Sequence, residues 1–85
     1  MLISETARRQ LYELDSSISS KIKTSVKELS INPFLNRPKA DIKKLKGSRN
    51  PDFYRLRVGD FRVIYTISNN DVKITEILRR DKAYD

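Results

Sequence analysis

The stretch from Phe53 to Ile67 constrains the fold of this chain more than any other. Two runs of alternating apolar and charged residues flank the dipeptide Gly59-Asp60. This arrangement predicts a β-hairpin with a two-residue loop. Counting outward from the loop sets every cross-strand pair, from Val58–Phe61 next to the loop to Tyr54–Tyr65 further along. The hairpin therefore predicts both the register of a sheet and the residues on each of its faces.

The two faces of the predicted hairpin differ in chemistry, because side chains of a strand alternate between faces. One face is apolar and consists of Tyr54, Leu56, Val58, Phe61, Val63 and Tyr65. The other has Arg55, Arg57 and Arg62 around Ile64. Arg57 opposite Arg62 is a like-charge pair, which destabilises a sheet. Guanidinium groups match phosphate oxygens, so we interpret this face as an anion site. A merely solvated face is the alternative.

Composition narrows the possible functions. The 85 residues suffice for one domain, residues 1–85, and the net charge of +7 favours nucleic acid, an anionic surface or an acidic protein as partner. The sequence has no cysteine and no histidine. These absences exclude disulfides, thiolate metal sites and Ser-His or Cys-His catalysis. No apolar run is long enough to span a membrane, and we expect a cytoplasmic protein.

The N-terminal third has the apolar spacing of helices. We predict two helices, 4–14 and 17–30, packed as a helical hairpin on one side of the sheet, with Ser4 as the first N-cap. The segment Asp15-Ser16-Ser17 interrupts the pattern between them. A single bent helix is the alternative. Residues 1–3 are too few to assign by themselves.

The remaining segments predict one or two more strands. Residues 39–47 could form a helical turn or a short strand, and they include the densest basic stretch, Lys43, Lys44 and Lys46. Residues 72–79 predict a strand that follows a loop at Asn69-Asn70. That loop pairs Ile67 with Val72, Tyr65 with Ile74 and Arg62 with Ile77. It puts Arg79 beside the arginine face and Glu76 on the apolar face, where we have no account of it.

The predicted architecture is α+β. An N-terminal helical hairpin covers one face of a small, mostly antiparallel sheet of three to four strands and leaves the arginine face open.

The hairpin block 54–65, the preceding Leu-Lys-Gly and the ending Arg-x-x-x-Tyr give the chain a family resemblance. The chain resembles the RelE/ParE superfamily of bacterial and archaeal toxins over nearly its whole length, and its ending looks like the RelE branch. The resemblance implies a toxin of a type II toxin–antitoxin pair that cuts mRNA in the ribosomal A site. It also implies a RelB-like antitoxin as partner, operator DNA bound through the complex, and a possible heterotetramer.

Site residues follow from the resemblance position by position. Arg62 matches the arginine that contacts the scissile phosphate, Arg80 the arginine before the tail, and Tyr84 the tyrosine near the attacking 2′-hydroxyl. Arg55 and Arg57 stand where some members have catalytic lysines. Family members also open with a longer strand, so residues 1–3 are expected to be a vestigial or truncated strand.

The reaction itself requires no metal or cofactor. The 2′-hydroxyl attacks the adjacent phosphorus, and clustered cations stabilise the developing charge. We assign catalysis to Arg57, Arg62, Arg80 and Tyr84, with the pKa of Tyr84 lowered by neighbouring cations. Arginine cannot serve as the base, so Lys44, Lys46 or Lys82 could replace the missing lysines. We assign RNA or phosphate binding to Arg55, Arg79, Lys43, Lys44, Lys46 and Lys82.

Two other functions fit the same residues. One is a ParE-like inhibitor of DNA gyrase, which is a binder and not an enzyme. The other is a catalytically degenerate member that binds only antitoxin and operator DNA.

Overall fold

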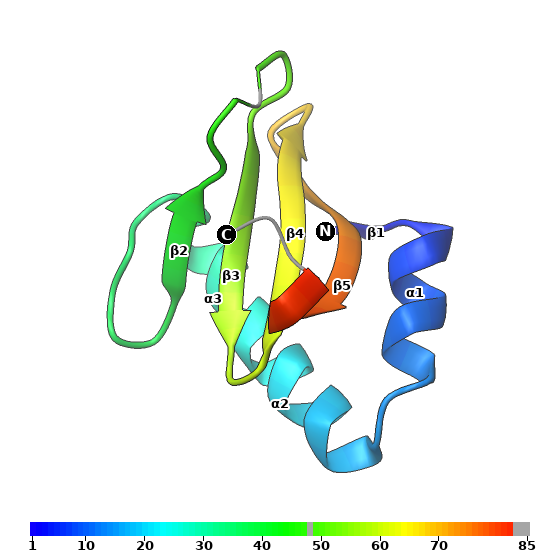
Figure 1. The fold of residues 1–85 in the computed structure, drawn as a ribbon. Helices are drawn as coiled ribbons and strands as arrows, with labels where there is room; N and C mark the ends of the chain where they lie inside the picture. Colours follow the sequence, from blue (N-terminus) through cyan, green and yellow to red (C-terminus); the bar gives the residue numbers. More distant parts are fainter. Residues whose placement is uncertain (48, 83–85) are drawn as a thin grey trace.

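The computed structural model describes residues 1–47 and 49–82 and has the predicted α+β architecture (Figure 1). The elements follow the order β1 (Leu2–Ile3), α1 (Glu5–Tyr12), α2 (Ser16–Val26), α3 (Glu28–Ile31), β2 (Asp41–Lys44), β3 (Phe53–Val58), β4 (Phe61–Ser68), β5 (Asp71–Arg79) and the 3-10 turn η1 (Arg80–Lys82). Within these residues the sheet has five strands in the order β1-β5-β4-β3-β2. β1 is parallel to β5, and the other neighbours are antiparallel.

The hairpin of β3 and β4 has the predicted register. Its six pairs run from Val58–Phe61 at the turn to Phe53–Thr66 at the far end. Gly59 at the turn has a φ of +58°, which glycine adopts without the steric penalty of a side chain. The hairpin is therefore correctly predicted by its turn chemistry and its alternation.

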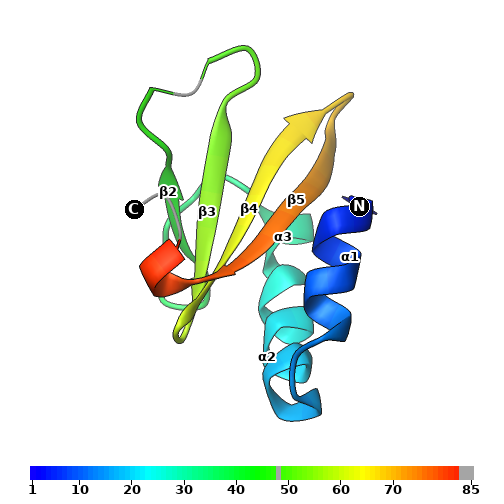
Figure 2. The ribbon, with the colours of Figure 1, turned by 45° about the vertical axis from the view of Figure 1, so that its right-hand side comes forward.

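The helices begin and break largely where the sequence indicates. The Ser4 hydroxyl accepts the Ala7 N–H at 3.0 Å and caps α1 as predicted. A break between α1 and α2 contradicts the single bent helix. The second predicted helix, 17–30, is divided at Lys27 into α2 and α3. Figure 2 shows all three α-helices on the same side of the sheet.

The core lies between these helices and the predicted apolar face of the hairpin. Its most deeply buried large side chains are Tyr65, Ile22, Leu29, Leu56 and Val63. Each fully buried side chain of this size stabilises the fold by about 1.5–3 kcal/mol. The Tyr65 hydroxyl donates to the Pro33 carbonyl at 2.6 Å, which satisfies its polar end.

One shift in register changes the far half of β5. Tyr65 pairs with Ile74 as predicted, but a bulge between Ile64 and Tyr65 then opposes Ile64 to Glu76. The predicted Arg62–Ile77 pair is therefore wrong, because Leu78 lies opposite Arg62. The extra residue is Thr75, whose hydroxyl donates to the Ile64 carbonyl at 3.2 Å. The bulge also turns Glu76 away from the apolar face, which resolves its unexplained predicted position.

Residues of the N-terminal region make hydrogen bonds to the backbone around the bulge. β1 ends at Ile3, and Ser4 donates its N–H to the Ile74 carbonyl and its hydroxyl to the Thr75 carbonyl, both at 2.8 Å. Beyond the bulge, the Ile77 N–H donates to the side-chain carbonyl of Gln10 on α1 at 2.7 Å. β1 ends before it could pair with this part of β5. The Gln10 side chain on α1 therefore supplies the acceptor that a neighbouring strand would otherwise provide.

The segment before the hairpin forms a short edge strand, so the strand alternative for residues 39–47 is confirmed as β2. The outward Ile42 N–H donates to the Asn36 side chain at 3.1 Å. This contact occupies a backbone donor that an edge strand otherwise exposes. None of the helices within residues 1–47 and 49–82 is both long and apolar enough to cross a membrane.

We expect the Gln10→Met variant to lose about 1–3 kcal/mol in the free energy of unfolding, because the Ile77 N–H loses its acceptor. Chemical denaturation measures this loss. Arg9→Met is the matched control on the exposed side of the same helix, and it should stay within about 0.5 kcal/mol of the parent. Equal stability of the two variants would contradict the proposed support of β5 by α1.

Candidate nucleic-acid interface

The sheet face opposite the α-helices, here called the open face, receives the predicted arginines. Cross-strand register gives this face successive rows of side chains. One row is Asp41, Arg57, Arg62 and Leu78, and the next is Lys43, Arg55, Ile64 and Glu76. The predicted grouping of three arginines around Ile64 is confirmed by this register.

The prediction that all three arginines lie open is wrong. Arg62 is only 3% exposed, and its guanidinium donates to the Gly59 and Phe61 carbonyls at 3.1 Å each. Arg55 is also largely covered, and it donates to the Asp41 carbonyl at 3.0 Å and the Asp41 carboxylate at 2.9 Å. Arg57 is exposed. The sheet backbone and one carboxylate thus compete with solvent for two of the three guanidinium groups.

Arg80 directly follows the last residue of β5 and begins η1. The Arg80 N–H donates to the Asp60 carbonyl at 2.8 Å, which ties η1 to the β3–β4 turn. Both ribbon views show η1, in red, on the side of the sheet away from the α-helices (Figures 1 and 2). The backbone of Arg80 therefore lies at the turn end of the sheet, on the same side as Arg57 and Arg62. Asp60, Arg79, Arg80 and Asp81 line a depression of about 290 Å³ where β5 ends beside the β3–β4 turn.

Two of the predicted phosphate-binding residues are not on the open face of the sheet. Arg79 pairs with Phe61 on the helix-covered face, and its guanidinium carbon is 5.4 Å from the centre of the Phe61 ring. The expectation that it lies beside the arginine face is wrong, because the bulge exchanges the faces of β5. Lys44 pairs with Tyr54, also away from the open face, and its ammonium lies 3.3 Å from the Asp52 carboxylate.

The other predicted cations stay near the interface. Lys43 is exposed next to Arg55 on the open face. Lys82 is exposed in η1, close in sequence to Arg80. Lys46 lines a cleft described below. The predicted catalytic Tyr84 lies outside the described residues.

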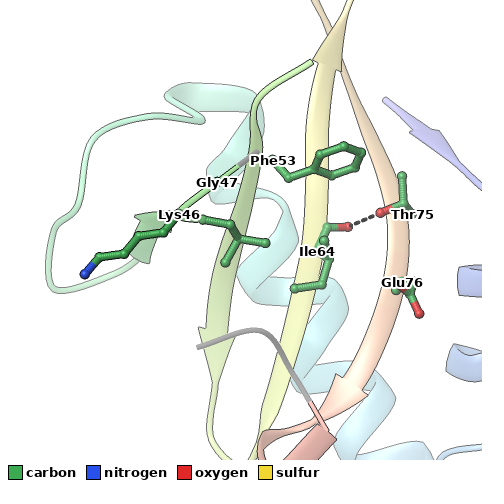
Figure 3. Close-up of a pocket in the computed structure, with 7 residues that line it drawn as sticks. Lys46, Gly47, Phe53, Ile64, Thr75 and Glu76 are labelled. Carbon is green, nitrogen blue, oxygen red and sulfur yellow. Dashed lines mark hydrogen bonds between the residues drawn. The ribbon is translucent and has the colours of Figure 1, made fainter. Parts of the chain in front are cut away.

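Sequence reasoning missed a cleft of about 390 Å³ on the open face. Leu45, Lys46, Gly47, Phe53, Ile64, Thr75 and Glu76 line it (Figure 3). The alternation of β3 could have indicated Phe53, which shares its face with Arg55 and Arg57. Alternation along β5 could not have placed Glu76 on this face, because the bulge changes which face its side chain is on.

Tyr65 does not belong to the chemistry of this face. Its side chain is buried, and burial raises the pKa of the phenol above its ordinary value. A phenol that donates to a backbone carbonyl and resists ionisation is a core residue, as the sequence predicts for Tyr65.

Residues 1–84 match the family described as "ParE toxin of type II toxin-antitoxin system, parDE", and the chain belongs to this family. This match confirms the predicted membership of the RelE/ParE superfamily.

Individual relatives are of the RelE type. The chain is 32% identical over 85 residues to Toxin RelE3 of Methanocaldococcus jannaschii, covering 100% of this chain and 94% of the relative. It is 40% identical over 78 residues to Putative toxin RelE1 of the same organism, covering 89% and 83%.

Solved structures agree with these relatives. A chain in the RelB-RelE antitoxin-toxin complex from Methanococcus jannaschii superposes with a TM-score of 0.78 at 30% identity, covering 100% of this chain and 96% of that one. A chain in the archaeal RelE-RelB complex from Pyrococcus horikoshii OT3 gives a TM-score of 0.75 at 31% identity, covering 95% and 93%. The chain is therefore a toxin of RelE type in sequence and fold.

The different burial of the paired arginines predicts different effects on stability. Arg62→Met should lose about 1–3 kcal/mol in the free energy of unfolding, because two turn carbonyls lose their donor. Arg57→Met, the matched control, should change it by less than about 0.5 kcal/mol. Thermal unfolding measures both, and a larger loss in Arg57→Met would refute the buried role of Arg62.

Proposed function

We propose that this protein is an endonuclease that cuts mRNA in the ribosomal A site. The observation that most supports this function is the Arg80–Asp60 backbone contact. This contact brings the backbone of Arg80, an exposed residue, to the turn end of the sheet face that carries Arg57 and Arg62. Such a cluster suits a phosphate that gains charge in the transition state. The RelE-type relatives support the same reading.

Each arginine has a distinct part in this proposal. Arg57 and Arg80 are exposed and bind the oxygens of the scissile phosphate directly. Arg62 is held against the turn by two carbonyls, so its charge is fixed before the substrate arrives. A preorganised charge requires no rearrangement at the moment of reaction. Lys43, which is exposed next to Arg55 in the next row, holds a flanking phosphate.

The chemical step is an internal transfer at phosphorus. The 2′-oxygen forms a bond to phosphorus, the bond from phosphorus to the 5′-oxygen breaks, and the products are a 2′,3′-cyclic phosphate and a 5′-hydroxyl. One group must take the 2′ proton, and another must protonate the leaving oxygen. The arginine side chain cannot be deprotonated in a protein, so it cannot act as the base. The base and acid therefore come from other side chains.

We assign the base to Tyr84 on the family resemblance. Among the described tyrosines, Tyr65 is excluded by its burial and raised pKa. Of the three lysines considered as replacements, Lys44 is near Asp52 and away from the open face. Lys46 and Lys82 are left as candidate acids. A set with no histidine is a modest catalyst, and the ribosome supplies the alignment of the 2′-hydroxyl.

Primer extension on a translated mRNA tests this function directly. We expect cuts inside codons when ribosomes are present and none in the free mRNA. The Arg57→Gln/Arg80→Gln double variant should slow cleavage by about 100-fold or more, because both exposed phosphate donors are lost. Arg9→Gln/Lys21→Gln is the control, since it removes the same charge from exposed helix positions.

Two outcomes would refute the endonuclease. One is an absence of cuts from a protein shown to be folded by circular dichroism. The other is equal cleavage by the double variant and its control.

Inhibition of DNA gyrase is the second candidate function, because the matching family is described as ParE toxin. In this function the same cations bind a protein or DNA surface and no bond is cut. A supercoiling assay with purified gyrase distinguishes the two functions. Loss of supercoiling together with intact mRNA would support the ParE-like function.

An acidic RelB-like antitoxin is the proposed partner. The solved relatives come from RelB-RelE complexes, and a net charge of +7 attracts an acidic segment that folds on binding. Operator DNA is bound through this complex, with a heterotetramer as its proposed form.

We expect this protein to co-purify with a small acidic protein encoded beside its gene, and the association rate to fall as salt increases. Stopped-flow mixing at several salt concentrations measures that dependence. An association rate independent of salt would contradict charge as the source of recognition.

A further inference from the structure

The cleft on the open face has an unusual combination of lining groups. Phe53 provides an apolar surface and Ile64, only 2% exposed, lies beneath it. Figure 3 shows the Phe53 ring extending across β4 toward Thr75. Thr75 and Glu76 form the wall on β5, and Lys46 lies on the opposite side. A volume of about 390 Å³ falls within the range of about 300–1,000 Å³ that is typical of small-ligand sites. A flat aromatic ligand with polar edges fits this chemistry.

The wall on β5 offers hydrogen-bond acceptors. The Thr75 hydroxyl donates its proton to the Ile64 carbonyl at 3.2 Å, so its oxygen can only accept from a ligand. An ionised Glu76 carboxylate also only accepts. A ligand edge that faces these two residues must therefore supply N–H donors.

The cleft lies next to the arginine cluster. Ile64 and Arg62 are two residues apart on the same face of β4, which corresponds to roughly 7 Å along a strand. A nucleotide whose phosphate contacts Arg57 and Arg80 can thus direct its base, or that of its neighbour, toward Ile64. Glu76 also makes the cleft itself unfavourable for a phosphate.

We propose that this cleft binds an unpaired nucleobase beside the cut phosphate and selects bases with an exocyclic amino group over uracil. The base stacks on Phe53, and stacking on an aromatic side chain tolerates any base. Selection comes from Glu76, which accepts from the amino group of adenine, cytosine or guanine. Uracil has no amino group, and its single N–H lies between two carbonyl oxygens that a carboxylate repels. The position beside a cut rests on the proposed endonuclease function.

A titration of the isotope-labelled protein with mononucleotides tests the cleft without ribosomes. The probes are 5′-AMP, 5′-CMP, 5′-GMP and 5′-UMP, followed by amide chemical shifts. We expect the amides of residues 45–47, 53, 64, 75 and 76 to shift with the first three probes. Binding of UMP should be about five- to tenfold weaker, the effect of one hydrogen bond to a base. Equal binding of all four probes would overturn the selection.

Two variants separate stacking from selection. Glu76→Gln replaces one acceptor by an amide that both donates and accepts, so UMP should bind as tightly as CMP. Phe53→Leu keeps an apolar side chain but removes the aromatic face, so binding of all four probes should weaken together. Glu13→Gln, at an exposed position at the end of α1, makes the same charge change as a control. Retained discrimination in Glu76→Gln would overturn the role of Glu76.

Sequencing of the cut ends on ribosomes then separates this proposal from the proposed function. Cuts that avoid uracil at one fixed position, with the avoidance lost in Glu76→Gln, support both. Cuts with no base bias, together with no shifts in the cleft, overturn the base site and leave the endonuclease intact. Base-selective binding without any cuts overturns the endonuclease and supports the selectivity of the cleft.

Discussion

The bulge at Thr75 is the feature on which both layers of this protein depend. It shifts the pairing of β4 and β5 by one residue, and Ser4 and Gln10 from the N-terminal region satisfy the backbone groups around it. Without the extra residue, the side chains beyond it would exchange faces. The same irregularity therefore fastens α1 to the sheet and brings Glu76 and Leu78 to the open face.

The cations of the open face differ in how far they are covered. Arg62 is used by the turn carbonyls and Arg55 by Asp41, whereas Arg57 and Arg80 are exposed. The Arg62 guanidinium donates to carbonyl oxygens and the Arg55 guanidinium to a carboxylate, so both make hydrogen bonds within the protein. Hydrogen-bonded guanidinium groups of this kind keep their geometry without a ligand, and the two exposed ones have the chemistry that the proposed phosphate site requires.

The open face combines two kinds of recognition over a short distance. The guanidinium groups at the turn end suit a phosphate, and the cleft of Phe53, Thr75 and Glu76 suits a neutral, flat, donor-bearing group. A single-stranded nucleic acid presents both chemistries in alternation along its chain. This match gives a physical reason for the proposed substrate class that does not depend on the relatives. The relatives, in turn, establish the toxin family independently of the cleft.

Local chemistry in the sequence determined the hairpin, the Ser4 cap, the apolar face and the family resemblance, because each depends on residues close together in the chain. Tertiary structure decided the rest. The bulge and the exchanged faces of Glu76 and Arg79 depend on backbone groups that distant segments satisfy. Arg62 is buried against carbonyls that are close to it in the chain, but alternation along a strand predicts the face of a residue and not its burial. Alternation along a strand predicts faces only while the register is unbroken, and no local signal marked the extra residue at Thr75.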